Sequence, residues 1–169
     1  MHPPTTPFAP TAPAAHPLAS DLENMQHALA QARLGASEGG VPIGGALVDK
    51  EGKLLGVGRN KRVQEKSAIL HGETDCLNNI GRLPASKYAG ATIYTTLSPC
   101  TMCSGAVVLF GISRVVMGEN STFVGGEDFL KSRGVEVVNL DLVECKQLMK
   151  DFIDKYPEIW NEDIGEEDT

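Results

Sequence analysis

The chain has 169 residues and a formal net charge of −7, which is enough chain for one domain with a buried core. The acidic balance disfavours nucleic acid as a partner, because phosphate backbones are bound by Lys and Arg, and it favours a small neutral substrate. No stretch has the apolar length of a membrane span, and four cysteines without a secretory segment favour a reducing compartment, the cytoplasm or the nucleus.

The N-terminal residues 1–19 have a composition unlike the rest of the chain. They hold six of the ten prolines and neither Lys nor Arg, so they resemble neither a signal peptide nor a transit peptide. We expect a disordered Pro-rich arm here, followed by a single domain over residues 20–169.

A first helix is predicted directly after this arm. Ser20 and Glu23 stand at the positions of a capping box, and the helix should end before Gly39. His27 points away from the apolar stripe and is expected to face solvent. The stripe consists of Leu22, Met25, Leu29 and Ala32.

A hairpin and three further strands are predicted next. Two apolar runs, 43–48 and 54–58, flank a short polar turn, and a second helix is expected over 71–80 with Gly81 past its end. Stretches long enough for helices separate the later β-branched runs, which indicates parallel strands joined by crossover helices. These runs are 92–96, 115–117 and 135–138.

The last predicted element is an amphipathic helix from Asp141 to Tyr156, which Pro157 should end. Its apolar positions are Leu142, Cys145, Leu148 and Phe152. Together the elements predict an α/β fold, with a central mixed β-sheet of about five strands flanked by helices.

The most informative pattern of the chain consists of one histidine, one glutamate and two cysteines. His71 and Glu73 are two residues apart, and Cys100 and Cys103 form a C-x-x-C pair after Pro99. One imidazole and two thiolates leave a tetrahedral Zn²⁺ with one open position, which is typical of a catalytic site. This H-x-E…P-C-x-x-C arrangement is that of zinc-dependent nucleobase deaminases.

The cysteine pair is predicted to lie at the start of a helix. Ser98 reads as the capping residue and Pro99 as the first helical residue, where its missing N–H costs little. Cys100 and Cys103 would then lie one turn apart on the same face. The partial positive charge of a helix N-terminus would favour their thiolate forms.

A lone C-x-x-C pair is also compatible with a redox pair or with half of a structural zinc site. A closed structural site needs four protein ligands, but Cys76 and Cys145 stand singly in apolar helical patterns and read as core residues. Two other histidines fall in the Pro-rich arm and His27 is expected on the surface. Only His71 remains as a credible imidazole ligand, for one Zn²⁺ per chain.

Seven short stretches make the chain resemble the fungal cytosine deaminases, within the zinc-dependent cytidine and deoxycytidylate deaminase family. The resemblance covers nearly the whole chain after the arm. It implies a homodimer of the cytidine-deaminase-like fold that converts cytosine to uracil and ammonia in pyrimidine salvage. The stretches are GGVPIGG, GRN, LHGE, YTTLSPC, CSGA, GEN and EDIGE.

The same resemblance implies the roles of the site residues. His71, Cys100 and Cys103 match the zinc ligands, and Glu73 matches the residue that moves protons between water, ring nitrogen 3 and the leaving amine. Backbone groups of Gly72 or Ser98 would hold the edges of the base. The side chains that match the substrate pocket are Asn60, Asp163, Ile43, Leu97, Phe123 and Trp160.

Each pocket residue also has an ordinary interpretation from the sequence alone. Asn60 is typical of a turn, Asp163 of a solvated charge, and Trp160 of packing. We expect the segment that follows Pro157 to be a lid over the pocket, as far as Gly165, with a frayed acidic end after it.

Three competing functions remain open at this point. A tRNA adenosine deaminase shares the fold and zinc chemistry, but it must bind a phosphate backbone, which the low Lys and Arg content disfavours. A cytidine or guanine deaminase is a second alternative. A zinc-stabilised binding module would hold the metal without turnover.

Overall fold

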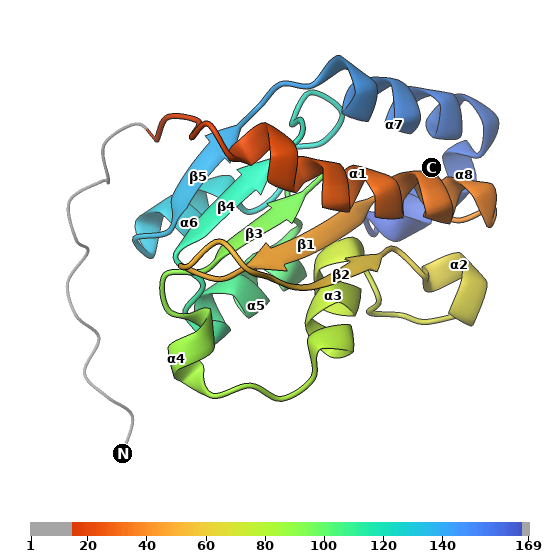
Figure 1. Ribbon diagram of the computed structural model, residues 1–169. Coiled ribbons are helices and arrows are strands. Elements are labelled where there is room, and N and C mark those ends of the chain that lie inside the picture. The colour runs from red at the N-terminus through yellow and green to blue at the C-terminus, as the bar shows by residue number, and fades with distance from the viewer. Residues whose placement is uncertain (1–14, 167–169) are drawn as a thin grey trace.

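The computed structural model describes residues 15–166, and its centre is a five-stranded mixed sheet with strand order β2-β1-β3-β4-β5 (Figure 1). β1 pairs with β2 and β3 in the antiparallel sense, whereas β3, β4 and β5 run parallel. The predicted α/β class, the hairpin and the parallel set are confirmed. The strands are β1 (Gly44–Val48), β2 (Leu54–Arg59), β3 (Thr92–Thr95), β4 (Arg114–Met117) and β5 (Glu136–Asn139).

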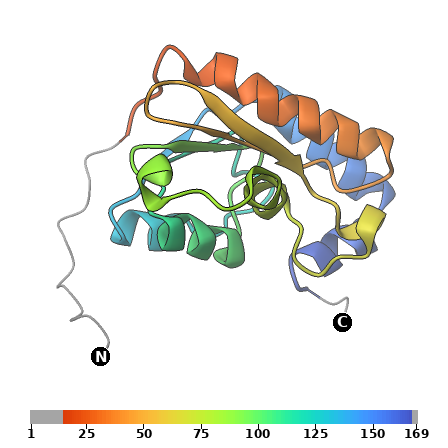
Figure 2. The ribbon, with the colours of Figure 1, turned by 60° about the horizontal axis from the view of Figure 1, so that its bottom comes forward.

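Helices cover both faces of the sheet (Figure 2). The helices α1 (Asp21–Ser37) and α7 (Val143–Lys155) lie on one face. The opposite face is covered mainly by α3 (Gly72–Ile80), α5 (Thr101–Phe110) and α6 (Glu127–Ser132). The remaining helices are short: α2 (Arg62–Glu65), α4 (Ala85–Tyr88) and α8 (Pro157–Asp163).

Successive side chains along each strand point to opposite faces of the sheet, so the core is divided into two clusters. Ile93 and Val115 pack in the cluster beneath α3 and α5, whereas their neighbours Tyr94 and Val116 pack in the cluster beneath α1. Cys76 and Cys145 are buried, one in each cluster, as predicted.

The start of α1 differs from the prediction. Ser20 makes no side-chain cap, and Leu22 is 56% exposed, whereas Asp21 is fully buried. Asp21 is inward because its carboxylate accepts hydrogen bonds from Arg114 of β4, at 2.6 and 2.8 Å, and from the Tyr94 hydroxyl. This ion pair between residues far apart in the sequence outweighs the preference of Leu22 for a buried position. His27 is exposed, as predicted.

The C-terminal segment forms two helices. α7 ends at Lys155, and Pro157 opens α8, so the predicted break at this proline is confirmed. The segment after it is helical and lies beside α2 at one end of the sheet (Figure 2). Residues 1–14 of the predicted arm lie outside the described residues. Within residues 15–166, no helix has both the length and the apolar character needed to cross a bilayer.

Candidate active site

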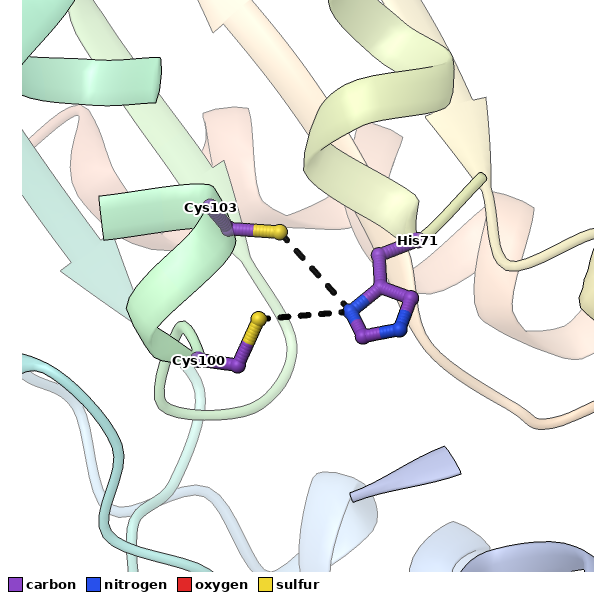
Figure 3. Close-up of side chains that lie close together, drawn as sticks. All are labelled: His71, Cys100 and Cys103. Carbon is purple, nitrogen blue, oxygen red and sulfur yellow. Dashed lines mark hydrogen bonds between the residues drawn. The ribbon is translucent and has the colours of Figure 1, made fainter. Parts of the chain in front are cut away.

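The histidine and the two cysteines are brought together by the starts of two helices (Figure 3). His71 is the N-cap of α3, and its N–H donates to the Thr74 hydroxyl at 2.9 Å. Cys100 is the N-cap of α5, and Cys103 follows in its first turn. The prediction that Ser98 caps this helix and Pro99 opens it is wrong by two residues, because Ser98 is engaged elsewhere.

Ser98 is buried and holds a neighbouring loop instead. Its hydroxyl donates to Glu127 at 2.7 Å and accepts from the Gly125 N–H at 3.0 Å. Its own N–H donates to the Glu119 carbonyl. These bonds fix the loop that carries Phe123, so Ser98 joins the metal-binding segment to the wall of the pocket.

The geometry of the three ligand atoms fits a zinc ion. The Nδ1 atom of His71 lies 3.4 Å from the Cys100 sulfur and 3.8 Å from the Cys103 sulfur, and the three atoms all lie within 4.8 Å of one another. Tetrahedral Zn²⁺ with ordinary Zn–N and Zn–S bonds separates such atoms by about 3.5–3.8 Å. One nitrogen and two sulfurs are also donors that Zn²⁺ prefers.

The electrostatics of the cluster favour a bound cation. A hydrogen bond from the Cys103 thiol, with help from His71, lowers the pKa of Cys100 to about 4 despite burial. The same contact with Cys100, together with burial, raises the pKa of Cys103 well above its usual value. One sulfur is therefore anionic at neutral pH, and binding of zinc would release the proton of the other.

Glu73 lies beside this cluster and is 3% exposed. Burial, together with the nearby Cys100 charge, raises the pKa of its carboxyl group. The Thr95 hydroxyl donates to its Oε1 atom at 2.8 Å and holds the carboxylate in place. A buried carboxyl with a raised pKa next to a metal site is suited to general acid and base chemistry. Thr95 was missed from the sequence because it reads as an ordinary strand residue.

Close packing between α3 and the sheet sets the position of this helix. A Cβ atom added at Gly58 would lie 2.1 Å from the Cys76 nitrogen. Gly72, predicted to touch substrate, lies against the backbone of Ile43 and Gly44 and is not among the cavity-lining residues. The glycines therefore let α3 approach the strands closely enough to aim His71 and Glu73 into the pocket.

Residues from opposite ends of the chain form the polar side of the pocket. The Asn60 amide, directly after β2, donates to both carboxylate oxygens of Asp163 at 3.0 and 3.1 Å. Asp163 is 8% exposed and is not a solvated charge, whereas Asn60 is fully buried and also accepts from the Arg62 N–H at 3.0 Å, as a turn residue does. Asp163 also lies 3.8 Å from His71, whose pKa it helps to raise, with Cys100, against the effect of burial.

A cavity of about 20 Å³ joins these groups, and Phe123 and Trp160 meet edge to face across it, with ring centroids 6.1 Å apart. The predicted wall residues are therefore brought together with the metal cluster. Ile164 also lines the cavity and was missed, since nothing in the sequence separates it from other apolar residues near the C-terminus. The lining residues are Ile43, His71, Glu73, Leu97, Ser98, Cys100, Phe123, Trp160, Asp163 and Ile164.

The fold and the site together define a zinc-dependent deaminase. The family model of the cytidine and deoxycytidylate deaminase zinc-binding region matches residues 18–119, which is more than half of the chain. The chain belongs to this family.

Individual relatives agree with this assignment. The chain is 55% identical over 146 residues to the cytosine deaminase of Candida albicans, covering 86% of this chain and 97% of that protein. It is 30% identical to a tRNA-specific adenosine deaminase of Haemophilus influenzae, covering 80% and 84% of the two chains. A solved structure of guanine deaminase from Nitrosomonas europaea shares the fold, with a TM-score of 0.65, 22% identity and coverage of 84% and 88%.

Proposed function

We propose that this protein hydrolyses cytosine to uracil and ammonia, and that the reaction serves pyrimidine salvage in the cytoplasm. The observation that carries the proposal is the small pocket in which Asp163, held by the buried Asn60 side chain, lies together with the metal cluster and Glu73. The extent of the similarity to the Candida albicans cytosine deaminase supports the same substrate. The tRNA-specific relative is more distant, and a net charge of −7 does not suit a phosphate backbone.

His71, Cys100 and Cys103 would hold the zinc ion, with the geometry described above. A zinc ion held there would lower the pKa of a water molecule to about 7 and so supply hydroxide at neutral pH. The remaining chemistry is the movement of protons, which falls to the protein.

Glu73 performs these proton transfers. Glu73 would accept the proton that water loses on forming hydroxide, and it would deliver this proton to ring nitrogen 3 as the hydroxide adds to carbon 4. Glu73 then moves the proton of the new hydroxyl group to the amine, which leaves as ammonia and gives uracil. The raised pKa of Glu73 suits both directions of transfer, and Thr95 keeps its carboxylate oriented.

Asp163 and Asn60 select the free base. The Asp163 carboxylate would accept a hydrogen bond from ring N1–H, and this role is supported by the Asn60 side chain, which holds the carboxylate. In cytidine the ribose replaces this hydrogen, which would remove the hydrogen bond between the base and Asp163 while Asn60 and Arg62 still hold the carboxylate. A site built around such a donor discriminates by about 10⁴-fold against the analogue that lacks it.

A homodimer is part of the same proposal. The helix α5 exposes a row of large apolar side chains, and Leu109 is 77% exposed. An apolar helix face of this kind is typical of a subunit interface. The other exposed apolar residues of this helix are Met102 and Phe110. Sedimentation velocity on the purified protein should give the mass of two chains, and a monomer at micromolar concentration would contradict the interface.

Ammonia release from a panel of substrates tests the proposed reaction. The zinc-loaded protein should deaminate cytosine with a specificity constant on the order of 10⁴ times that for cytidine. Guanine and adenosine, free or within a tRNA anticodon stem, should give no ammonia above background. Comparable rates with cytidine would indicate a cytidine deaminase, and turnover of tRNA alone would indicate a tRNA adenosine deaminase. Stoichiometric zinc without any turnover would indicate a binding module.

A further inference from the structure

The substrate pocket is narrow in this structure. Its volume of about 20 Å³ is room for roughly one water molecule, which is far too little for a pyrimidine ring. Trp160, Asp163 and Ile164, from α8 and the residue that follows it, form part of its lining. A pyrimidine ring therefore fits only after part of this lining has moved.

Two kinds of contact hold α8 over the pocket. On the apolar side, Trp160 packs edge to face against Phe123. On the polar side, the Arg62 guanidinium donates to the Asp163 carboxylate at 3.2 Å and to the Glu162 carbonyl at 3.1 Å. Arg62 comes from α2, which lies beside α8 (Figure 2), so its two bonds cross from one element to the other.

The contact between Arg62 and α8 has properties that suit reversible opening of α8. The side chain is 19% exposed, so water can replace its partners on one side. Its Nε atom is buried and has no hydrogen-bond partner within residues 15–166. The closed state therefore carries an unsatisfied donor, which reduces the net gain from the two good bonds. A contact with a modest net free energy is what reversible opening requires.

An open surface groove of about 490 Å³ lies on the outer side of this contact. Asp163 lines both the groove and the pocket, so it lies between the two spaces, and its partner Arg62 lies on the groove side. Separation of Arg62 from α8 would join them. The residues that line the groove are Arg62, Val63, Lys66, Ser67, Ala68, Ile159, Glu162 and Asp163.

We propose that Arg62 is a positioning residue that latches α8 closed, and that the groove between α2 and α8 is the route of the nucleobase. The substrate named here rests on the proposed function. Arg62 does not line the pocket, so it acts through Asp163 and α8 and takes no part in the chemistry. Its loss should weaken closure over the substrate while the chemical step keeps its rate.

Hydrogen exchange and kinetics on the zinc-loaded protein test the latch. In Arg62→Met, amides of α8 should exchange at least about fivefold faster, while those of α7 keep their protection. The KM for cytosine should rise by about tenfold, with the single-turnover rate constant within threefold of the parent value; tenfold corresponds to about 1.4 kcal/mol. Arg62→Lys should recover part of both changes, since it keeps the charge but loses the paired geometry.

Lys66→Met is the matched control, because it removes a positive charge from the same groove without touching either Arg62 contact. It should leave the exchange of α8 amides at the parent level. Unaltered α8 exchange in Arg62→Met, or a fall in the single-turnover rate at constant KM, would overturn the latch. Equal effects of Lys66→Met and Arg62→Met would also overturn the latch, because the changes would then follow from loss of positive charge in the groove. If the parent protein failed to act on cytosine, the proposed function would fail while the exchange result still decided the latch.

Discussion

Replacement of Glu73 by Gln isolates proton transfer from every other property of the site. The two side chains have the same shape, and the amide oxygen can still accept the hydrogen bond that Thr95 donates at 2.8 Å. Glu73 is 3% exposed and is not one of the three candidate ligands, so the fold and the metal content should be retained. What the variant loses is a group that can take up and release a proton.

The size of the effect follows from that loss. A positioned general acid and base contributes roughly 10²–10⁴-fold to the rate, which corresponds to about 2.7–5.4 kcal/mol of activation free energy. Glu73 serves both proton transfers in the proposed sequence, so a fall of kcat towards the upper end is expected. KM should change little, because the proposed contact of the base with Asp163, which Asn60 holds in place, is retained in this variant.

Ammonia release under saturating cytosine, with zinc measured in the same sample, is the assay for Glu73→Gln. Thr95→Val is the matched comparison, because it keeps the carboxylate and removes only the hydroxyl that orients it. Its kcat should fall about tenfold, as expected for one hydrogen bond to a charged group. A Glu73→Gln protein with full zinc and near-parental kcat would refute the assigned role. A greater loss in Thr95→Val than in Glu73→Gln would refute it as well.

Three further predictions concern the metal, the core and the lid. Cys100→Ser should remove most of the zinc, and a full complement by metal analysis would contradict the ligand assignment. Burial raises the pKa of Asp21, but the hydrogen bonds from Arg114, the Leu18 N–H and Tyr94 together lower it further, so stability should fall as pH drops below about 3.8. Arg114→Met should lower the free energy of unfolding in urea by about 3–5 kcal/mol and reverse its dependence on pH. An unchanged urea midpoint would contradict both expectations. Truncation after Gly165 should be nearly harmless, whereas truncation after Pro157 should abolish turnover with zinc still bound, and activity there would exclude α8 from the site.

The elements of this fold were predictable where local pattern and tertiary environment agree. The hairpin from β1 to β2 has a turn in which the Asp49 carboxylate accepts from two backbone N–H groups, and the sequence shows this as a polar run between apolar ones. α3 likewise ends at Gly81 as predicted. In these segments each choice of residue favours the same structure as the final packing does.

Prediction failed where a partner distant in sequence decides the outcome. Asp21 is inside and Leu22 outside because Arg114, 93 residues away, supplies the charge that a buried carboxylate needs. Ser98 looks like a helix cap, but its hydroxyl is taken by Glu127 of α6. Neither partner can be chosen from the sequence, because many other charged residues would satisfy the same local rules.

The same distinction separates the two halves of the active site. The metal half uses short motifs at the starts of α3 and α5, so its residues were recognisable from spacing alone. The substrate half depends on contact between Asn60 and Asp163, 103 residues apart, and on an arginine that no motif marks. Because α8 supplies the second half only after it docks, binding of zinc and binding of the base should be separable. The metal cluster can then form while α8 is away from the pocket, whereas the base is enclosed only once α8 has docked and Arg62 holds it.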